Sequence, residues 1–183
     1  MMTIRVYLAG PFTAVAASAS GTIDVHSPWR HVLEDTERAL VDRGWQVFLP
    51  HRDVSDWGLR EAPPEQIATE CLEAVLRSDC VVAVLGESFG THVEVGTAIG
   101  RNIPIIVIDA TEEASSFFGK AVTASRLVTA IRLDNLCELP AAVASERFDQ
   151  AVHRAGVLPH RSSGSRGGRP AAGDDMAASL TSS

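Results

Sequence analysis

A short stretch in the middle of the chain, residues 87–91 (ESFGT), combines residue types that bind anions. It follows a continuous apolar run and opens a predicted helix, whose free backbone amides are suited to anions, phosphate above all. Ser88 and Thr91 add hydroxyl donors, and Gly90 lets the backbone approach a ligand closely. The loop is therefore a candidate anion-binding site.

Glu94 lies near the start of the same predicted helix. The helix dipole there favours the ionised form of a carboxyl group and lowers its pKa. A poorly solvated, ionised carboxylate can attack an electrophilic carbon such as the anomeric carbon of a sugar. Thr91-x-x-Glu94 is also a capping box, in which the glutamate only returns a hydrogen bond to the Thr91 backbone. The spacing alone favours the cap, because helix caps are far commoner than nucleophiles.

Two further loops with unusual content follow predicted strands. The first is Gly10-Pro11-Phe12-Thr13, in which Phe12 can either stack on a base or belong to the core. The second is His51-Arg52-Asp53, whose basic pair can hold an anion or a base edge, or can simply be solvated. In open parallel sheets, ligands bind beyond the carboxyl ends of the strands, so all three loops are expected at one edge.

Short apolar runs alternate with amphipathic segments along the chain. Strands are predicted at residues 3–9, 45–49, 79–85, 103–108 and 126–133. Helices are predicted at residues 28–43, 63–78, 91–100 and 139–155, with a polar loop over 51–62. The run 79–85 (DCVVAVL) is typical of a parallel strand buried on both faces. The alternation predicts a parallel sheet with right-handed crossovers.

The length of 183 residues fits one domain with a sizeable core. From about residue 160 the composition changes to SSGSRGGRPAAGDDMAASLTSS, which cannot bury a core. We therefore expect residues 1–159 to form the domain and residues 160–183 to be a disordered tail.

Charge and cysteine content exclude several classes of function. The net charge of −7 argues against nonspecific nucleic-acid binding, which needs basic patches. The three cysteines have no CxxC or Cys/His spacing, so we expect neither a metal site nor a disulfide framework. We expect the protein in a reducing compartment, the cytoplasm.

The first twenty residues have roughly the pattern of a secretory signal. However, Gly10-Pro11 interrupts the apolar run, and residues 6–9 (VYLA) are suited to a first core strand. We interpret the signal pattern as coincidence. No stretch is long enough to span a membrane, so no membrane partner is expected.

Three stretches resemble the nucleoside 2-deoxyribosyltransferase superfamily: YLAGPF (7–12), SDCVVAV (78–84) and GTHVEVGTAIGRNIPIIVI (90–108). Their order and spacing match over about residues 3–135. The resemblance implies an α/β, flavodoxin-like three-layer sandwich, with a five-stranded parallel sheet and helices on both faces. It also implies that Glu94 attacks C1′ of a nucleoside and releases the base, with no metal or organic cofactor. This favours a catalytic role for Glu94 over a cap alone.

Within the superfamily, the sequence is similar to two phosphate-handling branches: the hydrolases of 2′-deoxynucleoside 5′-monophosphates and the CMP-type N-glycosidases. In both, a Ser six residues before the catalytic Glu binds the 5′-phosphate, and Ser88 has this spacing. Ser125 resembles a serine that the first branch donates across a homodimer interface. The GTHVE motif, and His51-Arg52 followed by Trp57-Gly58, resemble the second branch, which the sequence matches better.

The sequence departs from the family pattern at two positions. Thr13 stands where both phosphate-handling branches have an Arg, and Arg52 can replace that cation if its loop folds inward. Cys71 stands where the family has a sugar-contacting Asp. Glu70 and Glu73 flank it, and we predict that Glu70 takes the role of that Asp.

The sequence therefore predicts a hydrolase that cleaves the N-glycosidic bond of a nucleoside 5′-monophosphate, CMP-like, to free base and (deoxy)ribose 5-phosphate. Glu94 and Glu70 are the predicted catalytic residues. The predicted substrate-binding residues are Tyr7, Gly10, Phe12, Thr13, His51, Arg52, Trp57, Ser88, Gly90 and a partner's Ser125. One alternative is a 2-deoxyribosyltransferase, which passes the sugar to a second base. Another is a non-catalytic nucleotide-binding module, which the departures at Thr13 and Cys71 motivate.

Overall fold

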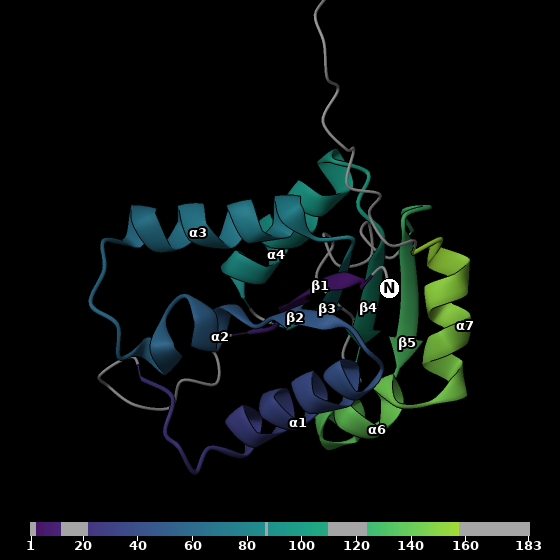
Figure 1. The fold of residues 1–183 in the computed structure, drawn as a ribbon, viewed down its shortest axis with the longest axis horizontal. Helices are drawn as coiled ribbons and strands as arrows, with labels where there is room; N and C mark the ends of the chain where they lie inside the picture. The colour runs from purple at the N-terminus through teal and green to yellow at the C-terminus, as the bar shows by residue number, and fades with distance from the viewer. Residues whose placement is uncertain (1–2, 12–21, 87, 110–123, 158–183) are drawn as a thin grey trace, which may run out of the picture.

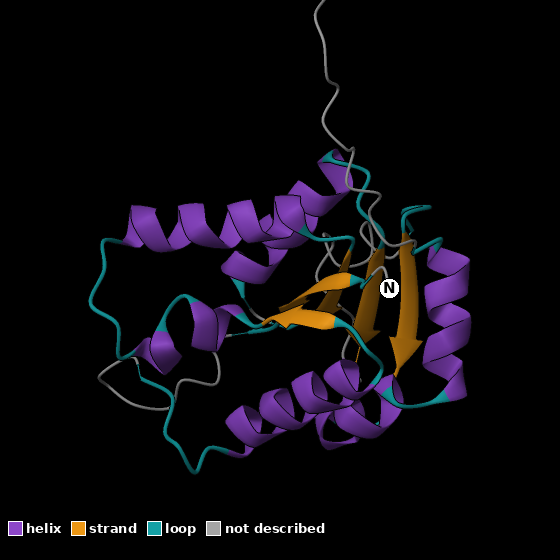
Figure 2. Ribbon diagram, viewed as in Figure 1, coloured by secondary structure: helices purple, strands orange, loops and turns teal. Residues whose placement is uncertain are grey.

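A five-stranded parallel sheet forms the centre of the protein (Figure 2). The computed structural model describes residues 3–11, 22–86, 88–109 and 124–157. The strands are β1 (Arg5–Ala9), β2 (Gln46–Phe48), β3 (Cys80–Val84), β4 (Ile105–Asp109) and β5 (Val128–Arg132). Their order across the sheet is β2-β1-β3-β4-β5, which is the flavodoxin-like order. The predicted fold class is confirmed.

Helices cover both faces of the sheet (Figure 1). One face carries α3 (Pro64–Arg77) and α4 (Phe89–Gly100). The other carries α1 (Pro28–Asp42), α6 (Leu139–Val143) and α7 (Glu146–Ala155). The short α2 (Pro50–Asp53) and the 3-10 turn η1 (Asp56–Gly58) follow β2, and a second 3-10 turn, η2 (Leu136–Glu138), precedes α6.

The two hydrophobic clusters follow the alternation of the strands, because successive side chains of a strand point to opposite faces. On β1, Val6 and Leu8 join the cluster under α1, α6 and α7. Tyr7 and Ala9 join the cluster under α3 and α4. All five residues of β3 are buried, as the continuous apolar run predicts. The alternation therefore aims the Tyr7 side chain at α3 and α4.

Three local predictions were wrong. The helix expected from residue 91 begins at Phe89, because the Ser88 hydroxyl caps it and accepts a 3.4 Å hydrogen bond from the Thr91 amide. The closing helix is broken into α6 and α7, because Ser145 caps a new helix and accepts from the Phe148 amide. The expected polar loop over 51–62 contains most of α2 and all of η1.

The last helix, α7, ends at Gly156, whose φ of 67° is the left-handed conformation that glycine adopts readily. The predicted tail, residues 160–183, lies outside the described residues. Within the described part of the chain, no helix has both the length and the apolar character needed to cross a membrane.

Candidate active site

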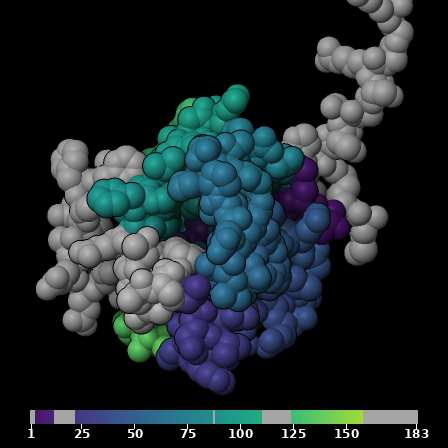
Figure 3. All heavy atoms as spheres, turned by 90° about the vertical axis from the view of Figure 1, so that its left-hand side faces the viewer, coloured from purple at the N-terminus to yellow at the C-terminus, as the bar shows by residue number. Residues whose placement is uncertain are grey.

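A cavity of about 540 Å³ lies beyond the carboxyl ends of β1, β2 and β3. Its walls come from the loop after β1, from α2, from the residues around η1, and from α3 and α4. Figure 3 looks onto the side of the molecule where α3 and α4 lie side by side. This is the edge of the sheet at which the loop positions predict a ligand.

Glu94 and Tyr7 meet beside this cavity. The Tyr7 hydroxyl donates a 2.6 Å hydrogen bond to Glu94 Oε1. Tyr7 is fully buried, its ring stacks on Phe48, and burial raises its pKa well above the ordinary value. Glu94 lines the cavity, and its Oε2 has no partner among the described residues. Among the described residues, the protein thus fixes one carboxylate oxygen of Glu94 and leaves the other without a partner.

The electrostatics of Glu94 overturn one prediction. Burial raises its pKa to about 7, and the hydrogen bond from Tyr7 only partly opposes this. The predicted lowering by the helix dipole was wrong, because the helix begins at Phe89 and Glu94 lies in its second turn. The dipole acts mainly within the first turn. The capping box was wrong as well, since Ser88 is the cap and Glu94 bonds to Tyr7.

The start of α4 supplies polar groups to the same cavity. Ser88, Gly90 and Thr91 all line it. The Thr91 hydroxyl is buried and has no hydrogen-bond partner within the described residues. A ring nitrogen of His92 lies 2.5 Å from the Ser88 carbonyl oxygen and holds the first turn. A helix of twelve residues that begins with an orphaned hydroxyl in a cavity is suited to bind an anion.

The loop after β1 approaches the cavity through Gly10. A Cβ at this position would lie 3.1 Å from the Trp29 ring, so a larger residue would displace that ring. Trp29 also donates a 3.0 Å hydrogen bond from its indole nitrogen to the Pro11 carbonyl. Trp29 thus fixes the path of the loop up to Pro11. The predicted contacts Phe12 and Thr13 lie outside the described residues.

His51 lines the cavity as predicted for a ligand-binding residue, but in a neutral form. Burial lowers its pKa to about 4, and the carbonyl groups of Pro11 and Gly10 only partly oppose this effect. An imidazole with this pKa carries no charge near pH 7. His51 can therefore contact a base edge. It does not supply the positive charge for binding an anion, which the adjacent basic residues His51 and Arg52 suggested in the sequence.

Arg52 does not line the cavity. Its guanidinium binds Glu37 at 2.5 Å and Asp53 at 2.7 Å. Both acidic partners hold Arg52 outside the cavity. This placement does not match the expectation that Arg52 folds inward and replaces the arginine of the related enzymes, where this chain has Thr13.

Trp57 also stands behind the cavity wall and not on it. It is buried, with its ring 6.1 Å from that of His51 and with the Arg30 guanidinium 4.5 Å over its centroid. The backbone carbonyl of Trp57 accepts a 2.8 Å hydrogen bond from the Ile23 amide. Trp57 therefore packs against His51 behind the cavity wall. Its predicted direct contact with a base stays a prediction, and its place behind the wall does not favour that contact.

The two candidates on α3 have different surroundings. Glu70 lies outside the cavity wall and forms a two-point ion pair with Arg60 at 2.6 and 2.8 Å, which lowers the Glu70 pKa to about 2. Cys71 lines the cavity close to Tyr7 and Glu94, and burial raises the pKa of its thiol. The position expected to contact a sugar therefore presents a neutral thiol. The neighbouring Glu70, which was predicted to make this contact, binds Arg60 instead.

Ser125 lies just before β5, at the amino edge of the sheet. Its hydroxyl accepts a 3.4 Å hydrogen bond from the Leu127 amide. The cavity opens at the opposite, carboxyl edge, so Ser125 cannot serve the site of its own chain. A contribution to a partner subunit's site stays a prediction.

Sequence reasoning missed several residues of the cavity. Arg60 was not singled out, and Thr91 was considered only as a hydroxyl donor and cap. One face of α3 also lines the cavity, at Pro64, Ile67, Ala68, Cys71 and Leu72. The i, i+3, i+4, i+7, i+8 spacing of that face was visible in the sequence, but it is equally typical of a helix face packed on a core. Among the described residues, no cluster of three or more His, Cys, Asp or Glu side chains could hold a metal ion.

The fold and the site together define a flavodoxin-like α/β protein with a ligand cavity beside a partly buried glutamate. The sequence pattern of the nucleoside 2-deoxyribosyltransferase family matches residues 6–130, and the chain belongs to this family. Members of the family act on small nucleoside or nucleotide substrates. No curated protein sequence matches this chain closely enough to support a comparison.

Solved structures show the same fold at low sequence identity. The CMP N-glycosidase BcmB from Clostridium botulinum is 22% identical, with a TM-score of 0.55 over 80% of this chain and 98% of that chain. The solution structure of BlsM is 20% identical, with a TM-score of 0.65 over 90% of this chain and 99% of that chain. A 2-deoxyribosyltransferase from Bacillus psychrosaccharolyticus is 20% identical, with a TM-score of 0.53 over 80% of this chain and 95% of that chain.

Proposed function

We propose that the protein hydrolyses the N-glycosidic bond of a nucleoside 5′-monophosphate, CMP-like, and releases free base and (deoxy)ribose 5-phosphate. The observation that carries this proposal is the partly buried Glu94 carboxylate, which lines the cavity and is fixed through Oε1 by Tyr7. A carboxylate placed in this way can act as the nucleophile of a retaining glycosidase.

In the proposed first step, Glu94 Oε2 attacks C1′ of the sugar. The C1′–N bond breaks, its electron pair leaves with the base, and the base takes a proton from solvent or from a polar group in the cavity. In the second step, water attacks C1′ of the glycosyl-enzyme and loses a proton to solvent, the bond between C1′ and Glu94 Oε2 breaks with its electron pair left on oxygen, and the Glu94 carboxylate is restored. Tyr7 holds the attacking group in place and its hydrogen bond favours the ionised form, which the attack requires.

The 5′-phosphate would bind at the start of α4. Ser88, Gly90 and the orphaned Thr91 hydroxyl line the cavity there. In the proposal the backbone amides of Gly10, Phe12 and Thr13 complete this subsite, as the family resemblance implies. Because the Ser88 hydroxyl already caps the helix, it would accept from the Thr91 amide and donate its proton to a phosphate oxygen.

A homodimer with Ser125 contributed by the partner subunit is part of the proposal. It is supported by two exposed apolar side chains of α4 beside the cavity, Phe89 at 94% and Val93 at 56% exposure. Gly96 and Gly100 continue this helix with open space where a Cβ would stand.

The three cysteines are unpaired thiols, which supports the cytoplasm as the compartment.

The test is a screen of CMP, dCMP, UMP, GMP, AMP and the matching nucleosides for release of free base, with Glu94→Gln as the control. We expect release from at least one nucleotide, none from the variant, and slower release from nucleosides. A new nucleoside, formed when a second free base is present, would identify a 2-deoxyribosyltransferase. Binding without release from any substrate would identify a non-catalytic nucleotide-binding module. Equal cleavage of nucleosides and nucleotides would refute the phosphate subsite at Ser88.

A further inference from the structure

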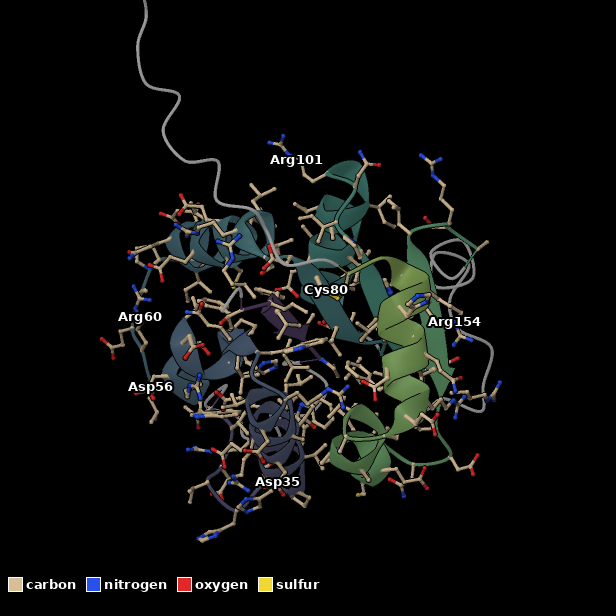
Figure 4. All side chains as sticks on the ribbon, turned by 45° about the vertical axis from the view of Figure 1, so that its right-hand side comes forward. Asp35, Asp56, Arg60, Cys80, Arg101 and Arg154 are labelled. Carbon is tan, nitrogen blue, oxygen red and sulfur yellow. The ribbon has the colours of Figure 1, made fainter. Side chains whose placement is uncertain are left out.

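The outer end of the cavity carries a cation that the proposed reaction does not yet use. Arg60 follows η1, and its side chain lines the cavity. Figure 4 shows the labelled Arg60 at the outer edge of the molecule. Among the described wall residues, Glu94 is the acidic side chain and Arg60 the charged basic one.

The hydrogen bonds of Arg60 leave one edge of its guanidinium available. Nη1 donates to Glu70 Oε2 at 2.6 Å and to the Val54 carbonyl at 2.9 Å, and Nη2 donates to Glu70 Oε1 at 2.8 Å. These bonds use three of the five N–H donors. The remaining two, on Nε and Nη2, lie on a single edge and have no partner among the described residues. Such an edge matches a ligand that presents two adjacent acceptors in one plane.

Glu70 compensates the charge of this arginine. Its carboxylate binds both terminal nitrogens of Arg60, and Gln66 donates a further 2.9 Å hydrogen bond to Oε1. The ion pair has no net charge, so its attraction for a phosphate is much weaker than that of an isolated arginine. The open edge is therefore better suited to a neutral planar group with acceptors than to an anion.

The pair also lies at a suitable place relative to Glu94. Glu70 immediately precedes Cys71, whose thiol lies close to Tyr7 and Glu94. The Glu70 side chain leans toward the amino end of α3, where Gln66 donates to it, so its partner Arg60 lies toward that end of the helix. Ile67, Ala68 and Leu72 line the cavity along this stretch and offer an apolar surface to a flat ring.

We propose that Arg60 recognises the base through its Nε and Nη2 edge, and that Glu70 is the positioning residue that orients and neutralises it. The inference rests on the proposed function. The edge selects bases with two adjacent acceptors, which are cytosine through O2 and N3, and guanine through O6 and N7. Uracil and adenine carry a donor beside the acceptor. One N–H group of the base would then face an N–H group of Arg60, which is unfavourable. Two donors on the base also stabilise the electron pair that it receives when the C1′–N bond breaks.

The test measures binding separately from cleavage. The dissociation constants of CMP, GMP, UMP and AMP are determined by calorimetry on the full chain carrying Glu94→Gln, with and without Arg60→Lys. Lysine keeps the positive charge and loses the planar edge. We expect Arg60→Lys to weaken CMP or GMP binding by roughly 10- to 100-fold and UMP and AMP binding by less than about 3-fold. Comparing CMP with GMP identifies which of the two bases the cavity accepts.

Glu70→Gln is the test of the positioning role. It keeps the shape of the side chain and removes its charge, so the free guanidinium should bind all anions better and discriminate less between bases. Arg77→Gln is the matched control, because Arg77 pairs with Glu73 on the exposed side of the same helix. Thermal unfolding of each variant checks that the fold is retained.

The outcomes separate this inference from the proposed function. A protein that binds CMP or GMP selectively, loses this selectivity in Arg60→Lys and cleaves nothing would contradict the hydrolase and keep the role of Arg60. An equal loss for all four nucleotides would make Arg60 a phosphate contact and overturn the inference. Unchanged selectivity in Arg60→Lys, or no binding of any nucleotide, would overturn it as well.

Discussion

The Tyr7 hydroxyl on the first strand donates a 2.6 Å hydrogen bond to Glu94 on α4, 87 residues later in the chain. This bond favours the ionised carboxylate, whereas burial favours the neutral acid and raises the Glu94 pKa to about 7. The balance between burial and one hydrogen bond therefore decides the fraction of active nucleophile at neutral pH. Tyr7 contributes through this bond without lining the cavity.

The first prediction concerns the pH profile of base release. Because the nucleophile must be ionised, kcat/KM should rise with pH and level off above about pH 7. Tyr7→Phe removes the hydrogen bond and keeps the ring that stacks on Phe48. A hydrogen bond to a charged group contributes about 1.5–3 kcal/mol, so the acid limb should move up by about one to two pH units. A limb that stays in place in this variant would show that Tyr7 does not control Glu94.

The second prediction concerns stability. The folded-state pKa of Glu94, about 7, lies above its ordinary value of 4.5. Its contribution to stability is therefore fully present below pH 4.5 and is lost as the pH rises through 7. Between pH 5 and pH 8 the wild type should lose up to about 3 kcal/mol of unfolding free energy from this group. Glu94→Gln should lose much less, and should exceed the wild type in stability at pH 8.

Urea unfolding at pH 5 and pH 8 measures this difference. Glu73→Gln is the control, since it removes a carboxyl group that is 56% exposed on α3 and pairs with Arg77, away from Glu94. A wild type and a Glu94→Gln variant with parallel pH dependence would mean that the folded protein solvates Glu94 well.

The third prediction separates the two roles of Ser88. The side chain caps α4 and, in the proposed function, contacts the 5′-phosphate. Ser88→Asp keeps a good cap but repels a phosphate, and Ser88→Asn keeps the cap without charge. Ser88→Ala should lower the unfolding free energy by about 1 kcal/mol, whereas the other two should lower it little. Ser88→Asp should raise KM for nucleotides most, and Ser88→Ala should raise it less, because it removes the hydroxyl donor without adding a charge. Both variants should leave KM for nucleosides nearly unchanged.

The comparison of nucleotide with nucleoside is the internal control for Ser88. If Ser88→Asp raised KM equally for both substrate classes, the phosphate would lie elsewhere in the cavity. If Ser88→Asn already abolished nucleotide preference, the hydroxyl itself would be the essential donor.

The sequence was sufficient to predict the sheet, but not the ionisation states and contacts of the site residues. The run 79–85 predicts a strand buried on both faces, and β3 is that strand. The start of α4 was placed two residues late, because both Ser88 and Thr91 are plausible caps and only the backbone path selects Ser88. The spacing of Glu94 within its helix is local information. Its pKa depends on Tyr7 and on burial by α3, which are set by the tertiary fold.

The basic residues illustrate the same limit. His51 and Arg52 are adjacent, yet His51 is buried and neutral in the cavity wall while Arg52 binds Glu37 and Asp53 outside it. Arg60 carried no motif, and its place in the cavity follows from the turn at η1 and from Glu70. No local pattern distinguishes these three side chains, because each meets an element other than its own: His51 the loop after β1, Arg52 the α1 residue Glu37, and Arg60 the α3 residue Glu70.

The fourth prediction concerns the turn that brings Arg60 to the cavity. Three successive residues have positive φ angles: Asp56 at 45°, Trp57 at 56° and Gly58 at 87°. A residue with a Cβ in this region costs about 1–2 kcal/mol. Gly58→Ala adds such a cost at a position that lines the cavity, and it should lower both the unfolding free energy and kcat/KM. Asp56→Gly relieves strain at an exposed position and should raise the unfolding free energy by up to about 1 kcal/mol.

Chemical denaturation of both variants, with base release measured in parallel, checks this prediction. Asp56→Gly serves as the control for Gly58→Ala, because the two changes act on the same turn in opposite directions. The turn holds Arg60 only if it keeps its left-handed path, so Gly58→Ala should also weaken the discrimination between CMP and UMP. If Gly58→Ala left that discrimination intact while lowering stability, the position of Arg60 would be set by its ion pair with Glu70 and not by the turn.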